Sequence, residues 1–150
     1  MPTVTLIPTS TVSQNGWVSP DIHTILDDDS NSVAQNNITC NFTGDMEDLD
    51  SSLSGETINS VKVTFKAQRG TKGNTTSVVA LKDSGGSDVV SETLSYTDAS
   101  NPESLETSAV TTQSDGSTPL TFSYINGCRL FINPASTGIT AFHLFATVDY

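Results

Sequence analysis

Short runs in which apolar and polar residues alternate recur along the whole chain. The clearest run spans residues 61–67, where valine, phenylalanine and alanine alternate with lysine and threonine. Successive side chains of a β-strand point to opposite faces, so this two-residue period predicts a strand with one buried face. Weaker runs of the same kind predict further short strands, at residues 4–6, 22–26, 38–42, 78–82, 90–96, 105–112, 120–124, 129–132 and 142–150.

Turn-forming segments separate these strands. Residues 69–74 contain two glycines and predict a hairpin that pairs the strand at 61–67 with the strand at 78–82. Residues 83–87 and the Asn126-Gly127 pair predict two further turns. This number of short strands predicts an all-β fold, an antiparallel jelly-roll or β-sandwich of about eight to ten strands.

The pattern contains no internal repeat and no domain boundary. We therefore expect a single jelly-roll domain at residues 21–150, preceded by an N-terminal segment at residues 1–20 that prolines interrupt. This segment is expected to be either the first strand or an arm that lies on a neighbouring subunit. Residues 45–56 are polar and predict a long loop.

The composition favours strands over helices. The chain of 150 residues contains 21 Ser and 22 Thr, which compete with helix formation, and it lacks runs of Ala, Leu, Glu and Lys. The net charge of −11 at pH 7 disfavours binding to nucleic acid and to anionic membranes. No stretch approaches the roughly 20 apolar residues of a membrane span, and the first residues lack the basic start of a secretory signal.

No catalytic constellation is evident, so we expect that the protein is not an enzyme. The two histidines, His23 and His143, have no nucleophile and carboxylate at a recognisable spacing. The Gly-x-Ser-x-Gly motif of a nucleophile elbow is absent from the sequence. Both histidines are interpreted as surface or interface residues.

Clustered carboxylates are the candidate metal ligands. They stand in two segments and comprise Asp27, Asp28, Asp29, Asp45 and Asp48. Several carboxylate oxygens on one loop can hold Ca²⁺, although neither cluster has the spacing of an EF-hand. The first interpretation is therefore solvated acidic loops with no cofactor, and the alternative is a calcium site.

Basic residues concentrate on one predicted hairpin. Four of the six fall on its first strand and turn, namely Lys62, Lys66, Arg69 and Lys72. One interpretation is lysine protection of an edge strand, and the other is a contact patch for an acidic partner. We take Lys62, Lys66 and Arg69 as candidate interface residues.

Two aromatic residues complete the candidate interface. Phe145 alternates out of phase with Leu144, so it is expected either to face a subunit interface or to belong to a second core layer. Trp17 is the single tryptophan of the chain, and an exposed Trp17 or a tyrosine is the expected stacking surface if a sugar binds. The two cysteines, Cys40 and Cys128, are expected to be free buried thiols, with an inter-strand disulfide as the alternative.

The order of these features resembles small jelly-roll virion proteins of tailed bacteriophages, cyanophage-like head decoration (cement) proteins or fibre modules. The resemblance covers nearly the full length. It rests on strand markers and turns, namely Trp17, Asp27 to Asp29, Ile58, Val61, Val63, Gln68, Arg69, Gly70, Val79, Leu81, Gly85, Gly86, Leu130 to Ile132, and the terminal Val-Asp-Tyr. No catalytic or ligand-binding residue carries over from it.

What the resemblance implies is a structural role in a phage virion. The first hypothesis is a decoration protein on the outer surface of the capsid. The resemblance implies a homo-oligomer, expected to be a trimer, that binds the major capsid protein and stabilises the assembled head. The alternative is a fibre or adhesin module that binds host surface glycan. A third hypothesis is a carbohydrate-binding domain or lectin outside viruses. None of the three involves nucleic acid or a membrane as partner.

Overall fold

The protein is an antiparallel β-sandwich, as the alternation predicted. The computed structural model describes residues 1–17, 21–27, 33–34, 40–70, 73, 75–135 and 138–150. Ten strands lie in the described residues: β1 (Thr3–Leu6), β2 (Pro8–Asn15), β3 (Val33–Ala34), β4 (Asn41–Met46), β5 (Ser60–Gln68), β6 (Thr75–Lys82), β7 (Asp88–Tyr96), β8 (Glu103–Glu106), β9 (Arg129–Pro134) and β10 (Thr140–Asp149). Three short helical segments accompany them, α1 (His23–Leu26), η1 (Ser51–Leu53) and α2 (Phe122–Ile125).

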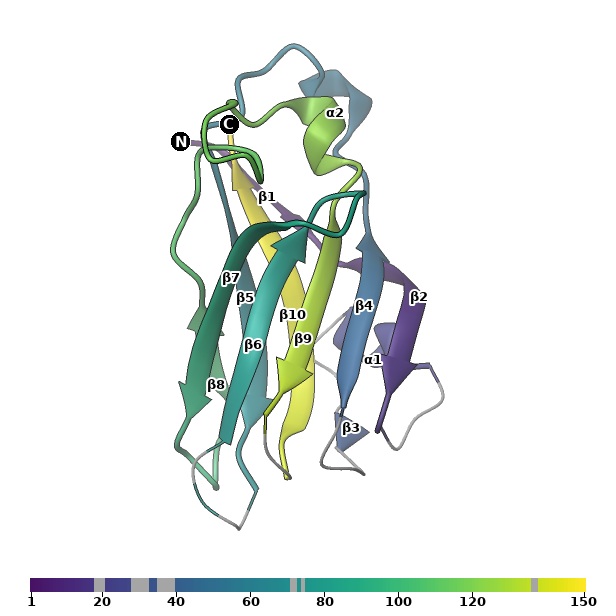
Figure 1. Ribbon diagram of the computed structural model, residues 1–150, viewed down its shortest axis with the longest axis vertical. Coiled ribbons are helices and arrows are strands. Elements are labelled where there is room, and N and C mark those ends of the chain that lie inside the picture. The colour runs from purple at the N-terminus through teal and green to yellow at the C-terminus, as the bar shows by residue number, and fades with distance from the viewer. Residues whose placement is uncertain (18–20, 28–32, 35–39, 71–72, 74, 136–137) are drawn as a thin grey trace.

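The strands form two sheets of five that stack face to face (Figure 1). The first, here the β10 sheet, has the order β1-β10-β5-β8, with β3 pairing β10 as well. The second, the β9 sheet, has the order β2-β4-β9-β6-β7. Within the described residues, no helix is long and apolar enough to cross a membrane.

The core fills the space between the sheets, because alternate residues of each strand point inward. In the β10 sheet the inward residues include Val63, Phe65 and Leu144, all fully buried. In the β9 sheet they include Leu81 and Ile132, also fully buried. Burying side chains of this size stabilises the fold by about 1.5–3 kcal/mol each.

Tyr96 ties the two sheets together. Its ring packs edge-on against Phe65 with 5.6 Å between ring centroids. Its hydroxyl donates a hydrogen bond to the Phe65 carbonyl oxygen across 2.9 Å. Burial raises the pKa of this phenol, so it remains a neutral donor.

The predicted hairpin at residues 69–74 is wrong. β5 pairs with β10 and β8, whereas β6 pairs with β9 and β7, so the connection passes from one sheet to the other. Gly70 lies directly against the backbone of Gly138 at this end of the sandwich. Lys82 on β6 therefore lies in the opposite layer from Lys62 and Lys66.

Two predicted strands are helical turns instead. Residues 22–26 contain α1, and residues 120–124 overlap α2. Ile22 and Leu26 are fully buried and four residues apart, a spacing that suits a helix as well as a strand, so a short run cannot distinguish the two periods. Thr121 caps α2 by accepting a hydrogen bond from the Tyr124 N–H.

The Asn126-Gly127 pair likewise ends a helix rather than making a hairpin. Asn126 is the C-cap of α2, and its backbone N–H donates to the Phe122 carbonyl. Its side chain accepts a hydrogen bond of 2.8 Å from the Leu49 N–H. Asn126 thus fastens α2 to the segment after β4. The predicted long loop at residues 45–56 is also shorter than expected, because β4 extends to Met46 and η1 follows.

The N-terminal segment contributes one strand to each sheet. β1 pairs with β10, and β2 pairs with β4. The described residues of this segment therefore pair within the chain. Trp17 follows β2 and is only 6% exposed, and its indole N–H donates to the Asn41 carbonyl across 2.9 Å. The expectation of an exposed Trp17 is wrong because the ring fills the core beside β4.

A β-bulge in β10 decides which face its aromatic residues take. Ala141 pairs with Ala67 and His143 pairs with Lys66, so Phe142 is the extra residue. Beyond the bulge the buried residues are Leu144, Ala146 and Val148. A strict alternation with Leu144 would bury Phe142, but the bulge removes Phe142 from the buried row.

The two cysteines are free and buried. β4 pairs with β9 so that Phe42 lies opposite Ile132 and Asp45 opposite Arg129. Cys40 and Cys128 precede these two antiparallel strands and lie at opposite ends of the pair, about 20 Å apart at roughly 3.3 Å per residue. A disulfide is excluded at that separation. Burial raises the pKa of both thiols to about 12.

Candidate functional site

Three of the five candidate interface residues gather on the outer face of the β10 sheet. Phe145 pairs with Thr64, between His143 opposite Lys66 and Thr147 opposite Lys62. The Lys62 ammonium lies 2.8 Å from a carboxylate oxygen of Glu106 on β8. This face therefore combines a partly exposed aromatic ring with two lysines.

Arg69 and Trp17 lie away from that face. Arg69 follows β5 at the end of the sandwich, where its guanidinium donates to the carbonyl oxygens of Thr97 and Gly70. These bonds close the loop end between the sheets. Trp17 is buried in the core, as described above.

The candidate metal ligands do not converge in the part of the chain that the structure describes. There, no three His, Cys, Asp or Glu side chains lie close enough together to hold a metal ion. Asp45 is already engaged, since it accepts hydrogen bonds from Arg129 and Ser10. Asp48 is exposed and Asp27 is partly buried, while Asp28 and Asp29 fall outside the described residues.

Several other carboxylates fasten loops. Asp83 accepts from Ser114 Oγ across 2.6 Å and from the N–H groups of Gly85 and Ser87, and these bonds lower its pKa. Asp115 accepts from Thr118, and its pKa falls to about 2. Part of the acidic excess therefore stabilises turns rather than forming a reactive pair.

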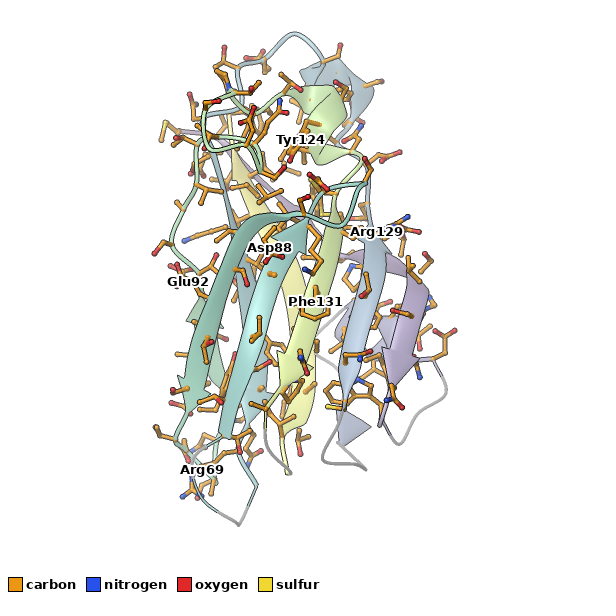
Figure 2. The ribbon with its side chains drawn as sticks, viewed as in Figure 1. Arg69, Asp88, Glu92, Tyr124, Arg129 and Phe131 are labelled. Carbon is orange, nitrogen blue, oxygen red and sulfur yellow. The ribbon has the colours of Figure 1, made fainter. Side chains whose placement is uncertain are left out.

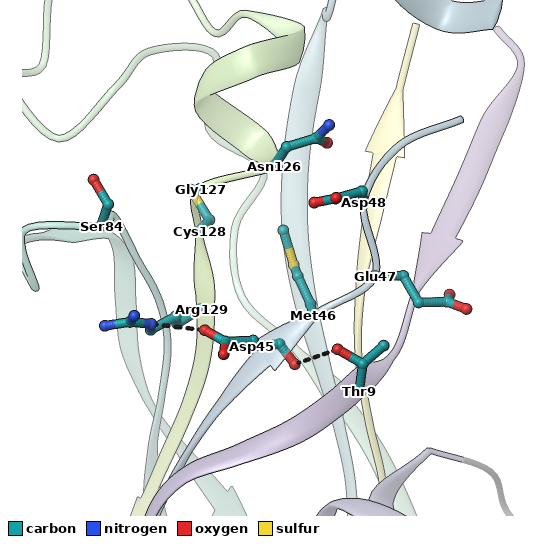
Figure 3. A pocket seen from close by; sticks show the side chains of 10 residues that line it. All are labelled: Thr9, Asp45, Met46, Glu47, Asp48, Ser84, Asn126, Gly127, Cys128 and Arg129. Atoms are coloured by element: carbon teal, nitrogen blue, oxygen red, sulfur yellow. Dashed lines mark hydrogen bonds and ion pairs between the residues drawn. The ribbon is translucent and has the colours of Figure 1, made fainter. Parts of the chain in front are cut away.

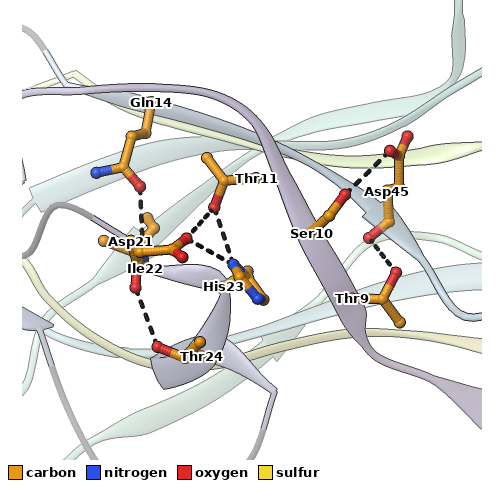
Figure 4. Close-up of polar contacts among 9 residues, drawn as sticks. All are labelled: Thr9, Ser10, Thr11, Gln14, Asp21, Ile22, His23, Thr24 and Asp45. Atoms are coloured by element: carbon orange, nitrogen blue, oxygen red, sulfur yellow. Dashed lines mark hydrogen bonds and ion pairs between the residues drawn. The ribbon is translucent and has the colours of Figure 1, made fainter.

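Sequence reasoning missed a Thr-Asp-His cluster beside β2 (Figure 4). His23 Nδ1 lies 2.6 Å from Asp21 Oδ1 and 3.1 Å from Thr11 Oγ1. A hydrolytic triad instead places its nucleophile and its carboxylate at opposite ring nitrogens. This cluster therefore holds α1 against β2. The hydrogen bond that Thr11 donates to Asp21 lowers the pKa of that carboxyl group.

A second missed feature lies on the outer face of the β9 sheet, around a central aromatic ring. Phe131 of β9 lies opposite Thr43 of β4 and Ala80 of β6, and its side chain is partly exposed (Figure 2). The Lys82 ammonium lies 4.8 Å from the centre of its ring. Lys82 also forms an ion pair of 2.5 Å with Asp88 of β7.

A second ion pair lies two residues before Phe131 on β9, at Arg129. Arg129 Nε donates to Asp45 Oδ1 across 2.9 Å (Figure 3). Ser10 of β2 donates to the other oxygen of Asp45 across 3.0 Å. We call the outward side chains of Asp45, Lys82, Asp88, Arg129 and Phe131 the Phe131 face.

An open hollow of about 720 Å³ adjoins the Phe131 face. Asp45 and Arg129 form its border with that face, and its other lining residues include Asp48, Ser84 and Asn126. Its walls come from the end of β4, the β6–β7 turn and the C-terminal end of α2 (Figure 3). The hollow and the face together offer an aromatic surface bordered by hydrogen-bond donors and acceptors.

The signal for this site was present in the sequence. Arg129, Phe131 and Asn133 alternate with buried Leu130 and Ile132, so a strict two-residue period places the phenylalanine on the outside. The ion pairs could not be inferred, because they join residues of strands whose pairing was unknown.

Comparisons with known proteins show the fold. No family model and no curated protein matches the sequence. The C-terminal carbohydrate-binding module (CBM6) of LamC, a marine laminarinase from Zobellia galactanivorans, matches with TM-score 0.56 and 11% identity, over 99% of this chain and 100% of that chain. Isomalto-dextranase of Arthrobacter globiformis T6, complexed with panose, matches with TM-score 0.51 and 11% identity, over 99% of this chain and 23% of that chain.

A phage protein is also among the similar structures. The enzymatically active domain of tailspike protein 4 of bacteriophage CBA120 matches with TM-score 0.42 and 14% identity, over 96% of this chain and 19% of that chain. A likeness at this level adds no argument. The resemblance to phage virion proteins that the strand pattern suggested has no family match and stays a prediction.

Proposed function

We propose that this chain is a non-catalytic module that binds carbohydrate through the Phe131 face, in the setting of a phage virion. The observation that carries the proposal is the partly exposed Phe131 ring at the centre of an open sheet, next to a row of two ion pairs in which Lys82 lies opposite Arg129. The fibre or adhesin hypothesis that the sequence suggested is thereby preferred to capsid decoration.

The chemistry of the Phe131 face suits a sugar. One face of a pyranose ring presents C–H groups, which pack well on an aromatic ring, whereas its edge carries hydroxyl groups. Binding sites for small molecules combine such an apolar surface with a few oriented polar groups. The ion pairs hold Arg129 of β9 and Lys82 of β6 in place near the ring, which limits the entropy lost on binding.

The fold supports the proposal at the level of architecture. The LamC module and the isomalto-dextranase domain share this sandwich; the first is a carbohydrate-binding module, and the second is part of an enzyme complexed with a saccharide. Because identity is 11% in both cases, the likeness supports the architecture, and the Phe131 face itself supports the ligand class.

Screening against immobilised glycans, followed by titration of the hits, tests this function. We expect Phe131→Ala to weaken binding at least about tenfold, which corresponds to roughly 1.4 kcal/mol. The matched control is Phe145→Ala, which removes the same outward ring from the opposite sheet and is expected to bind like the parent protein. Equal affinity of all three proteins would contradict the proposal.

Capsid decoration is the second candidate, and the outer face of the β10 sheet favours it. Lys62, Lys66 and Phe145 lie together there, as a contact patch for an acidic protein surface would require. This hypothesis places the chain on the outer surface of the head as a trimer that binds the major capsid protein.

The decoration hypothesis has its own test. Light scattering is expected to give a trimer, and the protein is expected to co-sediment with assembled phage heads. Lys62→Glu combined with Lys66→Glu should abolish co-sedimentation, whereas Phe131→Ala should not. A monomer that leaves heads undecorated would exclude this candidate.

A further inference from the structure

We propose that the Phe131 face selects uncharged glycans and excludes anionic ones such as uronates and sulfated sugars. This inference rests on the proposed carbohydrate-binding function and deepens it by naming the ligand class. It follows from how the charges on and around the face are paired.

Each cation of the Phe131 face has its own carboxylate. Arg129 pairs with Asp45 across 2.9 Å, and Lys82 pairs with Asp88 across 2.5 Å. Two positive and two negative charges therefore sum to zero on the face. The neighbouring outward residues on β4 and β6, such as Thr43 and Val78, are uncharged.

The paired groups still offer hydrogen bonds. Of the guanidinium, Asp45 accepts only from the Nε–H, and within the described residues Arg129 makes no other side-chain hydrogen bond or ion pair. Its terminal N–H groups can therefore donate to sugar hydroxyl or ring oxygens, while the carboxylate oxygens can accept from sugar hydroxyls. A neutral polyol needs both kinds of partner, and the face supplies both.

The surroundings add negative charge. Glu47 and Asp48 line the adjoining hollow, and the whole chain carries a net charge of −11. A carboxylate or sulfate placed beside Arg129 would be the second anion on that cation and would also approach Asp48. Like charges at such separations oppose binding unless a free cation compensates them.

The Lys82 position also disfavours an anion. Its ammonium already contacts both Asp88 and the Phe131 ring, so a ligand anion would have to displace one of these contacts. A neutral sugar carries no charge that competes with Asp88 for this ammonium.

The test titrates the purified protein with three probes of matched length, a neutral hexose oligosaccharide, an oligouronate and a sulfated oligosaccharide, at low and high salt. We expect the neutral probe to bind, with an affinity that changes less than about twofold between 50 and 500 mM NaCl, because neutral contacts are not screened. Binding of an anionic probe as tightly as the neutral one, with loss of affinity in high salt, would overturn the inference. If no probe of any class binds, the proposed function itself fails.

Variants that change the charge of the Phe131 face provide the decisive comparison. Asp45→Asn and Asp88→Asn each free one cation on the face and are expected to raise the affinity for the oligouronate at least about fivefold, in a salt-sensitive way. Glu106→Gln is the matched control, because it frees Lys62 on the opposite sheet and changes the net charge equally. Asp45→Asn removes a carboxylate that accepts hydrogen bonds from Ser10 and Arg129, and its loss could weaken folding. Asp88→Asn leaves those bonds intact and therefore tests the inference independently. An equal gain in all three variants would show that net charge alone decides, and it would contradict selection by the face.

Discussion

Gly44 precedes Asp45 on β4, and it can be used to test how tightly this part of the sandwich is packed. It sits on the inward side of β4, opposite Leu130 of β9 and Thr11 of β2. A Cβ at this position would lie 2.8 Å from the Ser10 carbonyl oxygen and would overlap the Phe42 ring. Phe42 is fully buried, so the ring cannot swing into solvent.

We therefore expect Gly44→Ala to destabilise the protein. Overpacking of a filled core costs about 1–3 kcal/mol. Replacing glycine by alanine also restricts the unfolded chain, which offsets about 0.4–1 kcal/mol. The net loss of roughly 1–2 kcal/mol predicts a Tm lower by about 3–6 °C for a domain of this size.

Thermal unfolding followed by circular dichroism measures this difference. Gly55→Ala is the control, because a Cβ at Gly55 would meet nothing within 4 Å. Only the effect on the unfolded chain then remains, and the Tm of this control is expected to rise by about 1–4 °C. If Gly44→Ala melts at or above the temperature of the parent protein, the close approach of β2, β4 and the Phe42 ring is not as described.

Three further predictions concern the core and the loops. Tyr96→Phe removes the hydrogen bond to the Phe65 carbonyl and is expected to lower the free energy of unfolding by about 1–2 kcal/mol in urea titrations. Cys40 and Cys128 should resist a thiol reagent at pH 8 in the folded protein and should both react in denaturant, whereas recovery of no free thiol after unfolding would reveal a disulfide. The folded-state pKa of Asp115 is lowered from 3.8 to about 2, so its contribution is present above pH 3.8 and is lost as the pH falls through 2. The melting temperature should therefore fall across that interval, and Asp115→Asn should flatten the fall.

The strands were predictable where one face is buried over many residues. The run at 61–67 has a two-residue period that no helix can share, and it became the central part of β5. Residues 22–26 and 120–124 were too short for that distinction, because two apolar residues four apart fit one helical turn equally well.

Sheet membership could not be predicted from local pattern. A glycine-containing turn of six residues either reverses a strand within one sheet or carries it to the other layer, and only long-range pairing decides which. The segment at 69–74 does the latter, since β10 and β8 occupy both edges of β5. The same limit hid the Phe131 face, whose residues come from β4, β6, β7 and β9.

The positions of some candidate interface residues could be predicted from the sequence, and those of others could not, for physical reasons. Lys62 and Lys66 share parity on one strand, so their common face follows from the period. Phe145 alternates with buried Leu144, and its pairing with Thr64 places it between the two lysines. Trp17 had no periodic context, and its burial depends on Asn41, a residue distant in the sequence.

Mapping the ligand by NMR tests the central claim most directly. A ¹⁵N-labelled sample of this 15.8 kDa chain would be titrated with the neutral oligosaccharide that binds best in the screen. The account predicts that the largest amide shift changes fall on residues 129–133 of β9 and on the neighbouring parts of β4 and β6. Changes confined to β5 and β10, or no saturable change with any glycan, would contradict it.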